Sequence, residues 1–201
     1  MRPSKKGLRD IGVLTASVVV FAAYATPALP QEAVTTESMV RQLAGLETTA
    51  DIDVAALRQQ GLDRVKSRAD NTSLKRPPVA AQLLKLPHFN VEVQFNPDSP
   101  IIRPESYRTI GRIADALYDP KLLPYVVLIV GRTEATGKRE YNLTLSQRRA
   151  DAIRGVLVTT FKISPKRIQA VGLGEEQLQD AMHPAAAANR QIEVVTVRNG
   201  P

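Results

Sequence analysis

The clearest periodicity in the sequence lies between Phe89 and Phe95, where apolar and polar residues alternate strictly. This period of two predicts a half-buried β-strand. The run Tyr-Val-Val-Leu-Ile-Val at 125–130 is apolar throughout, as expected of a central strand that is buried on both faces. Two further strands are predicted at 168–171 and 191–198, and a Gly-Leu-Gly sequence ends the first of them.

Two helices are predicted between these strands. Apolar residues recur at helical spacing from Pro104 to Leu117. A second helix is predicted to run to about Thr160, with Asn142 or Thr144 as its N-cap. The resulting order β-α-β-α-β-β predicts an α/β two-layer sandwich with a mixed sheet.

The preceding residues, 26–85, are interpreted as accessory helices and a linker. One helix is predicted at 36–46, and a second at 54–66 with Asp53 as its N-cap. Neither helix has an apolar face wide enough to be stable alone. Residues 67–78 end in Lys-Arg-Pro-Pro and are interpreted as a flexible tether, with a docking or spacer segment as the alternative.

Residues 1–25 have the three-part pattern of a secretory signal peptide. A basic start is followed by an uncharged run of small and apolar residues from Ile11, and Ala23-Tyr24-Ala25 offers a cleavage site. A retained membrane anchor is the alternative, but the run is shorter than the roughly 20 apolar residues of a spanning helix. We therefore predict cleavage after Ala25 and export across the inner membrane.

Composition excludes several kinds of site. The 201 residues are 43% hydrophobic, which is enough for a core of normal size, and they include no cysteine. Zinc–thiolate sites, disulfides and thiol nucleophiles are therefore excluded. With His88 and His183 as its only histidines, the chain is not expected to hold a multi-histidine metal site, and no cofactor is implied.

Charge gives no support to nucleic-acid binding. If residues 1–25 are removed, the net charge of +7 falls by three to +4, because four basic residues and one acidic residue are lost. The remaining basic and acidic residues are interspersed, and only 4% of the chain is aromatic. A nucleic-acid-binding face should instead combine clustered basic residues with aromatic platforms.

The sequence also argues against an enzyme. It lacks the Gly-x-Ser-x-Gly elbow of serine hydrolases, and Gly172-x-Gly174 lacks the third glycine of a dinucleotide-binding loop. The adjacent residues Glu175 and Glu176 do not face one another as a glycosidase pair would. We interpret them as an exposed acidic turn.

A set of spaced motifs carries a resemblance to a known family. The motifs are Gly131-Arg132-Thr133-Glu134, Tyr141-Asn142, Leu145-Ser146, Arg148-Arg149-Ala150, Gly172-Leu173-Gly174-Glu175 and Asn189-Arg190. Over about residues 86–199 the chain resembles the OmpA-like C-terminal domain family, the peptidoglycan-associating module of outer-membrane proteins and lipoproteins. The resemblance implies non-covalent binding of the diaminopimelate of peptidoglycan stem peptides, in a periplasmic protein peripheral to the outer membrane or the cell wall.

The resemblance also implies which residues bind this ligand. Glu134 and Arg149 occupy the positions that hold the ammonium and the carboxylate of diaminopimelate, while Asn142 orders the site and Thr133 lies beside the acid. An acid and an arginine a few ångströms apart match a zwitterion, since arginine can grip a carboxylate with two parallel hydrogen bonds. From spacing alone, a structural salt bridge between Glu134 and Arg149 is an equal alternative.

Three residues depart from the family pattern. Glu134 replaces an aspartate, Arg132 replaces a histidine, and Asn96 stands where the family often has an aspartate after the first strand. Arg132 could pair with Glu134 and compete with the ligand. These changes support an alternative function, a periplasmic protein-interaction module with a degenerate wall-binding site that docks another envelope protein through residues 31–85.

Overall fold

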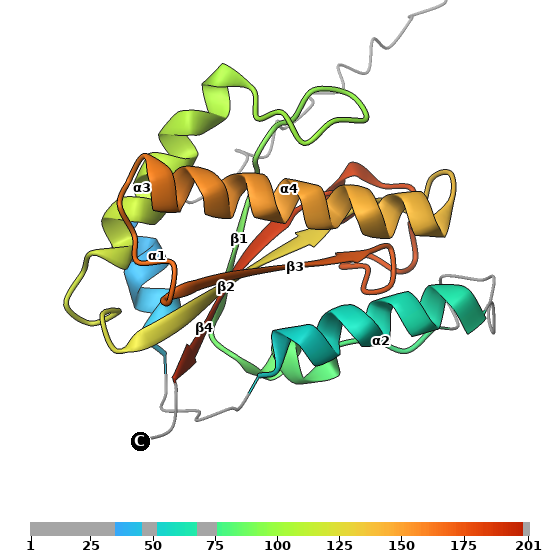
Figure 1. Cartoon of the computed structure of the whole chain (residues 1–201), viewed down its shortest axis with the longest axis horizontal. Helices are drawn as coiled ribbons and strands as arrows, with labels where there is room; N and C mark the ends of the chain where they lie inside the picture. The colour runs from blue at the N-terminus through green and yellow to red at the C-terminus, as the bar shows by residue number, and fades with distance from the viewer. Residues whose placement is uncertain (1–34, 46–51, 68–75, 199–201) are drawn as a thin grey trace, which may run out of the picture. The chain divides into compact units, whose positions relative to one another are not determined.

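The computed structural model describes residues 35–45, 52–67 and 76–198 (Figure 1). The predicted signal peptide lies outside the described residues, and so does most of the predicted tether, at 68–75. Within the described part of the chain, no helix is both long enough and apolar enough to cross a bilayer.

The described residues form a four-stranded sheet of β1 (His88–Val91), β2 (Tyr125–Arg132), β3 (Ile168–Gly174) and β4 (Ile192–Arg198), in the order β1-β4-β2-β3. The sheet is mixed, as predicted, because β2 runs parallel to β3 while β4 runs antiparallel to both β1 and β2. The apolar run of β2 thus lies in the interior of the sheet, between two neighbours.

The first strand is shorter than its alternating pattern predicts. β1 ends at Val91, and Phe95 forms only an isolated bridge with Ile102. The alternation nevertheless continues in burial, since Val93 is buried and its polar neighbours are exposed. Residues 92–103 therefore leave the sheet as a long connection, which forms one wall of the site described below.

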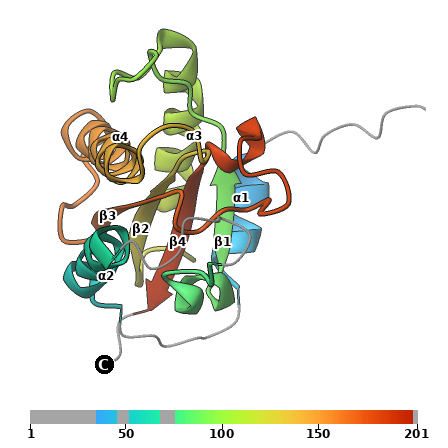
Figure 2. The same cartoon turned by 90° about the vertical axis from the view of Figure 1, so that its right-hand side faces the viewer.

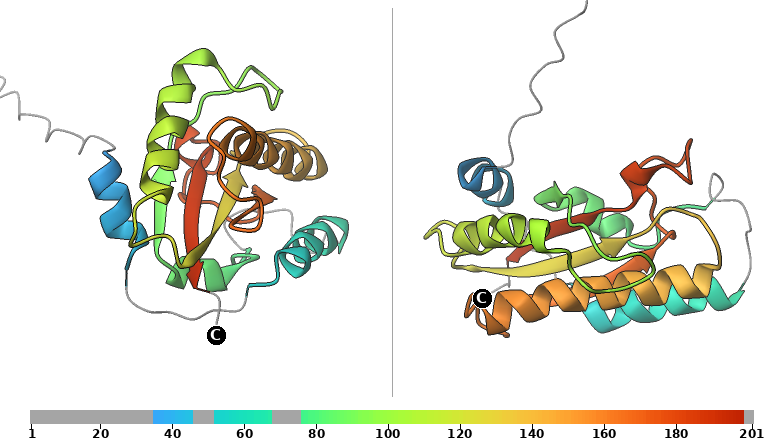
Figure 3. Two further views of the ribbon diagram at one scale, coloured as in Figure 1. Left: turned by 60° about the vertical axis from the view of Figure 1, so that its left-hand side comes forward. Right: turned by 90° about the horizontal axis from the view of Figure 1, so that it is seen from above.

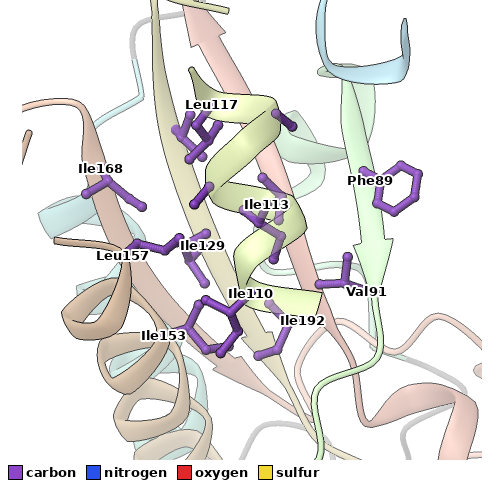
Figure 4. Close-up of a cluster of buried hydrophobic side chains, with 14 of the residues drawn as sticks. Phe89, Val91, Ile110, Ile113, Leu117, Ile129, Ile153, Leu157, Ile168 and Ile192 are labelled. Atoms are coloured by element: carbon purple, nitrogen blue, oxygen red, sulfur yellow. The ribbon is translucent and has the colours of Figure 1, made fainter. Parts of the chain in front are cut away.

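Helices α3 (Tyr107–Leu117) and α4 (Arg139–Thr159) cover one face of the sheet, joined at its β1 edge by α1 (Thr36–Leu43). Figure 4 shows the side chains that fill this layer, and in the left view of Figure 3 α1 lies beside α3. The order β1-α3-β2-α4-β3-β4 confirms the predicted order of elements.

The later part of the accessory segment, residues 52–67 and 76–85, covers the opposite face (Figure 2). Helix α2 (Val54–Ser67) and the 3-10 helix η2 (Ala81–Lys85) pack there against apolar side chains of β2, β3 and β4. Four residues of α2 at helical spacing are buried: Val54, Leu57, Gly61 and Val65. Because β2 is apolar on both faces, its second face requires such a cover.

Asp53 caps α2 as predicted. Its Oδ1 accepts hydrogen bonds from the backbone N–H groups of Ala55 at 2.8 Å and Ala56 at 3.1 Å. Replacing Asp53 by alanine should lower the free energy of unfolding by about 1 kcal/mol, as is typical when an N-cap is lost. Urea unfolding followed by circular dichroism measures this change.

Asp63→Ala is the matched control for the cap. Its carboxylate accepts a hydrogen bond from Gln59 on the exposed side of α2 and contacts no helix end. We expect Asp63→Ala to change stability by less than about 0.5 kcal/mol. Equal losses in the two variants would show that the cap contributes nothing specific.

Helix α4 begins earlier than predicted, and this changes the role of Asn142. The helix starts at Arg139, with Lys138 at the N-cap position, so Asn142 and Thr144 lie inside it and the predicted cap is wrong. The connection after β2 covers only residues 133–138, and α4 follows it directly in sequence. Asn142 therefore lies where its side chain can reach back to that connection.

Two glycines bring α4 into direct contact with the sheet. A Cβ atom on Gly131 would lie 2.3 Å from the Ser146 carbonyl oxygen, and one on Gly172 would lie 2.1 Å from the Gln147 backbone nitrogen. Both distances are far below van der Waals contact, so only glycine permits this approach. The helix that carries Arg149 is thereby fixed directly against β2 and β3.

Candidate binding site

A cavity of about 830 Å³ opens where several connections meet at one end of the sheet. Val91 of β1 and Gly131 of β2 both pair with Ile192, so the ends of β1 and β2 meet the start of β4 at this edge. The walls are the segment after β1, the loop after β2, the first turns of α4 and residues 187–191 before β4. Glu134, Arg149, Asn142, Thr133 and Asn96, predicted from the sequence, all line it.

The loop after β2 presents two buried oxygen atoms with unused hydrogen-bonding capacity. Thr133 is 3% exposed, and its backbone N–H donates to the Gly174 carbonyl at 3.0 Å. The Thr133 Oγ1 and the Glu134 Oε2 atoms have no hydrogen-bond partner among the described residues. Buried polar atoms of this kind nearly always have a partner, either in the protein or as ordered water, so both oxygens are available to a donor that enters the cavity.

The other carboxylate oxygen of Glu134 lies 3.5 Å from Nη1 of Arg190. The side chain of Arg190 is about half exposed, so this ion pair is accessible from the cavity. Glu134 therefore pairs with Arg190, and the structure does not contain the alternative salt bridge between Glu134 and Arg149. Arg190, part of the Asn189-Arg190 motif, thus contributes a cation to the cavity.

Arg149 is a buried cation on the α4 wall. Its Nε donates to the Ser99 carbonyl at 3.2 Å, and its guanidinium carbon lies 4.9 Å from the centre of the Phe95 ring, a cation–π contact. Burial lowers the pKa of Arg149, and the charge of Glu134 acts in the opposite direction. Arginine nevertheless remains protonated in proteins, so a cation is held here at the cost of desolvation.

Asn142 orders the loop that carries Thr133 and Glu134. It is 4% exposed, and its Nδ2 donates to the Thr136 carbonyl at 3.0 Å and lies 3.4 Å from the Glu134 carbonyl. The same group donates to Oε2 of Glu175 at 2.7 Å. Because an amide nitrogen carries two N–H groups, its two hydrogen bonds go to the nearer oxygens, those of Glu175 and Thr136, and the Glu134 carbonyl is a longer third contact.

The remaining two predicted residues differ in position. Asn96 is exposed at the rim, where its backbone N–H donates to the Ile101 carbonyl at 2.9 Å. Arg132 does not line the cavity: it is buried and pairs with Glu193 on β4, and burial lowers its pKa, although Glu193 opposes this. Pairing of Arg132 with Glu134 was therefore wrong, because Arg132 is still part of β2 and faces the neighbouring strand.

The structure also overturns the interpretation of Glu175 and Glu176 as an exposed turn. They are 6% and 3% exposed and pair with Arg76 and Arg139. Arg76 precedes Glu175 by 99 residues, so sequence spacing gave no sign of this contact.

Comparison with known proteins gives a consistent result. Residues 94–191 match the model of the OmpA family. The chain is 33% identical over 115 residues to outer membrane porin F of Pseudomonas fluorescens, a match that covers 56% of this chain and 34% of the porin. It is 35% identical over 106 residues to the peptidoglycan-associated lipoprotein of Mesorhizobium japonicum, covering 53% of this chain and 61% of the lipoprotein.

Among solved structures, the peptidoglycan-associated lipoprotein from Burkholderia pseudomallei is 30% identical, with a TM-score of 0.43, and the match covers 52% of this chain and 87% of that one. The chain thus spans about a third of the length of the porin and about three fifths of the length of the Mesorhizobium lipoprotein. None of these relatives is named as an enzyme, in agreement with the sequence analysis.

Proposed function

Since residues 94–191 are an OmpA-family domain, we propose that the chain binds the diaminopimelate of peptidoglycan stem peptides without covalent attachment. In this proposal the predicted signal peptide, residues 1–25, exports the chain to the periplasm, where it contributes to envelope integrity beside the outer membrane or cell wall. The main support is the cavity itself, which combines the buried guanidinium of Arg149 with one oxygen each of Thr133 and Glu134 that has no partner among the described residues.

The charges of the cavity suit the free end of diaminopimelate, which carries an ammonium and a carboxylate on one carbon. The ammonium has three N–H donors, and Oε2 of Glu134 and Oγ1 of Thr133 are buried acceptors without a partner among the described residues. Arg149 uses its Nε toward Ser99, and its terminal nitrogens are the donors that would face the ligand carboxylate. Each half of the zwitterion thus has a counterpart on a different wall.

The cavity is larger than this one carbon centre requires. Its volume of about 830 Å³ also leaves room for the neighbouring peptide units of the stem. Each charge-assisted hydrogen bond contributes roughly 1.5–3 kcal/mol, and ordering and desolvation offset much of it. A single stem peptide should therefore bind weakly, and the high local concentration of stems in the polymer compensates.

Glu134→Gln tests the ammonium half of the site. The substitution keeps the shape and removes the charge, so binding to diaminopimelate-type peptidoglycan should weaken about tenfold, the effect of losing one charge-assisted bond. Thermal unfolding should be almost unchanged, since one oxygen of this carboxylate has no partner among the described residues and the other forms only a long ion pair with the half-exposed Arg190. Co-sedimentation of the full chain with purified peptidoglycan measures the binding.

Two controls make this test specific. Glu92→Gln removes an exposed acid from the rim of the same cavity and should leave sedimentation unchanged. Lysine-type peptidoglycan carries the ammonium without the second carboxylate and should sediment the chain much less. Equal sedimentation with both wall types would count against zwitterion recognition.

The alternative of a docking module acting through residues 31–85 receives less support. Most apolar positions of α1 and α2 that could form such a surface are buried within the chain, including Met39, Leu43 and Leu57, each at most 2% exposed, whereas Leu62 of α2 is 44% exposed. An envelope protein as partner stays a proposal whose test is sedimentation: a folded parent chain that fails to bind the wall would favour it.

A further inference from the structure

A buried group of four charged residues lies behind the loop of the binding site. This ionic cluster consists of Arg76, Arg139, Glu175 and Glu176. Arg76 contacts Glu175 at 3.0 Å and Glu176 at 3.1 Å, and Arg139 contacts Glu176 at 2.8 Å. The side chains of Arg76 and Glu176 are 3% and 1% exposed, so the charges are shielded from solvent.

The ionic cluster connects directly to the cavity wall through Asn142. Glu175 accepts from Arg76 with one carboxylate oxygen and from Asn142 with the other, at 3.0 and 2.7 Å. Asn142 in turn donates to the Thr136 carbonyl. An uninterrupted chain of hydrogen bonds thus leads from Arg76 to the loop that carries Glu134.

Arg76 belongs to a segment outside the residues matched by the OmpA family, 94–191. This segment is attached a second time, because Oε1 of Gln177 accepts a hydrogen bond from the Ala80 backbone N–H at 2.9 Å. The segment that leads into η2 is therefore attached to the turn after β3 at two points, Arg76 and Ala80.

From this geometry we infer that Arg76 is a positioning residue for the binding loop, acting through Glu175 and Asn142. The inference rests on the proposed function, because Arg76 does not line the cavity and can affect ligand binding only through the loop. Removing one partner of a buried ion pair leaves an uncompensated charge, which is strongly unfavourable. Without Arg76 the turn at Glu175 should therefore relax toward solvent, and Asn142 should lose its hold on the loop.

Hydrogen exchange of the full chain tests this without any ligand. The amides of Thr133 and Ala135 donate to the carbonyls of Gly174 and Pro184, so their exchange reports whether the loop is ordered. In Arg76→Gln both amides should exchange at least about tenfold faster than in the parent, in the manner of local opening. Arg76→Lys keeps the charge and should recover part of the protection.

Arg58→Gln is the matched control. Arg58 also joins the accessory segment to the sheet, by a hydrogen bond to the Ala170 carbonyl at 2.6 Å, and among the described residues it makes no hydrogen bond to the binding loop. Its replacement should leave exchange at Thr133 and Ala135 unchanged. Unchanged exchange in Arg76→Gln, or an equal rise in Arg58→Gln, would overturn the inference.

Wall binding is measured on the same variants. Sedimentation of Arg76→Gln with diaminopimelate-type peptidoglycan should fall about tenfold, while Arg58→Gln should sediment like the parent. If the parent does not sediment, the proposed function fails, and loop exchange still decides the role of Arg76. Should Arg76→Gln not fold, the charge-balanced pair Arg76→Gln with Glu175→Gln carries the same test, with faster loop exchange expected and parent-like exchange overturning the inference.

Discussion

Arg149→Ala is expected to abolish sedimentation of the chain with diaminopimelate-type peptidoglycan. The guanidinium is the buried cation of the cavity, and it is the proposed partner of the ligand carboxylate. Losing a two-pronged contact of this kind costs on the order of 3 kcal/mol, which corresponds to a loss of about 100-fold in affinity. Because the parent chain is expected to bind one stem peptide only weakly, a roughly 100-fold loss of affinity should leave no measurable sedimentation.

The neighbouring Arg148 provides a matched control, because it is exposed on α4 and does not line the cavity. Arg148→Ala should sediment like the parent. Arg149→Lys keeps the charge without the planar fork and should bind weakly. Urea unfolding of Arg149→Ala should show a loss of stability of about 1 kcal/mol, because the hydrogen bond to Ser99 and the contact with Phe95 are removed. Sedimentation unaffected by Arg149→Ala would place binding elsewhere on the chain.

Gly172→Ala is expected to lower the free energy of unfolding by at least about 3 kcal/mol, a large share of the stability of an ordinary domain. The new Cβ atom would lie 2.1 Å from the nitrogen and 2.5 Å from the Cα atom of Gln147. Both are backbone atoms of α4, so no side-chain rotation relieves the clash. The helix would have to move away from β3, and the hydrogen bond from Gly172 to Gln147 would be lost.

Gly155→Ala is the corresponding control within α4. A Cβ atom there would meet nothing within 4 Å, so the substitution should raise stability by roughly 0.5–1 kcal/mol through helix propensity. Urea unfolding of the two variants beside the parent separates close packing from propensity. A similar small change in both would mean that α4 adapts to the added methyl group without cost.

Periodicity was enough to predict the order of strands and helices. The alternation at 89–95 and the apolar run at 125–130 each report how many faces of a strand are buried, and this information is local. The same holds for α2, whose apolar positions recur at helical spacing. That the second face of the sheet is covered by α2 was not predicted, because no local pattern states which surface a helix will cover.

The partners of charged residues were the least predictable part of the site. Arg132 and Glu193 belong to adjacent strands but are 61 residues apart in sequence. Arg190 and Glu134 meet only because the residues before β4 come to lie beside the loop after β2. Glutamate is usually exposed, so burial of Glu175 and Glu176 required knowledge of two distant arginines. In each case the missing information was tertiary.

The sheet order has a consequence for when the protein can fold. Residues 125–174 contain β2, α4 and β3, which contact one another locally and can assemble as the chain is made. Among the described residues β1 pairs only with β4. Phe89 therefore has no partner strand until Val194 has been synthesised. Such distant pairing slows folding and leaves apolar strands open to aggregation. A chain emerging from the ribosome cannot complete its sheet until residues 192–198 have left the exit tunnel.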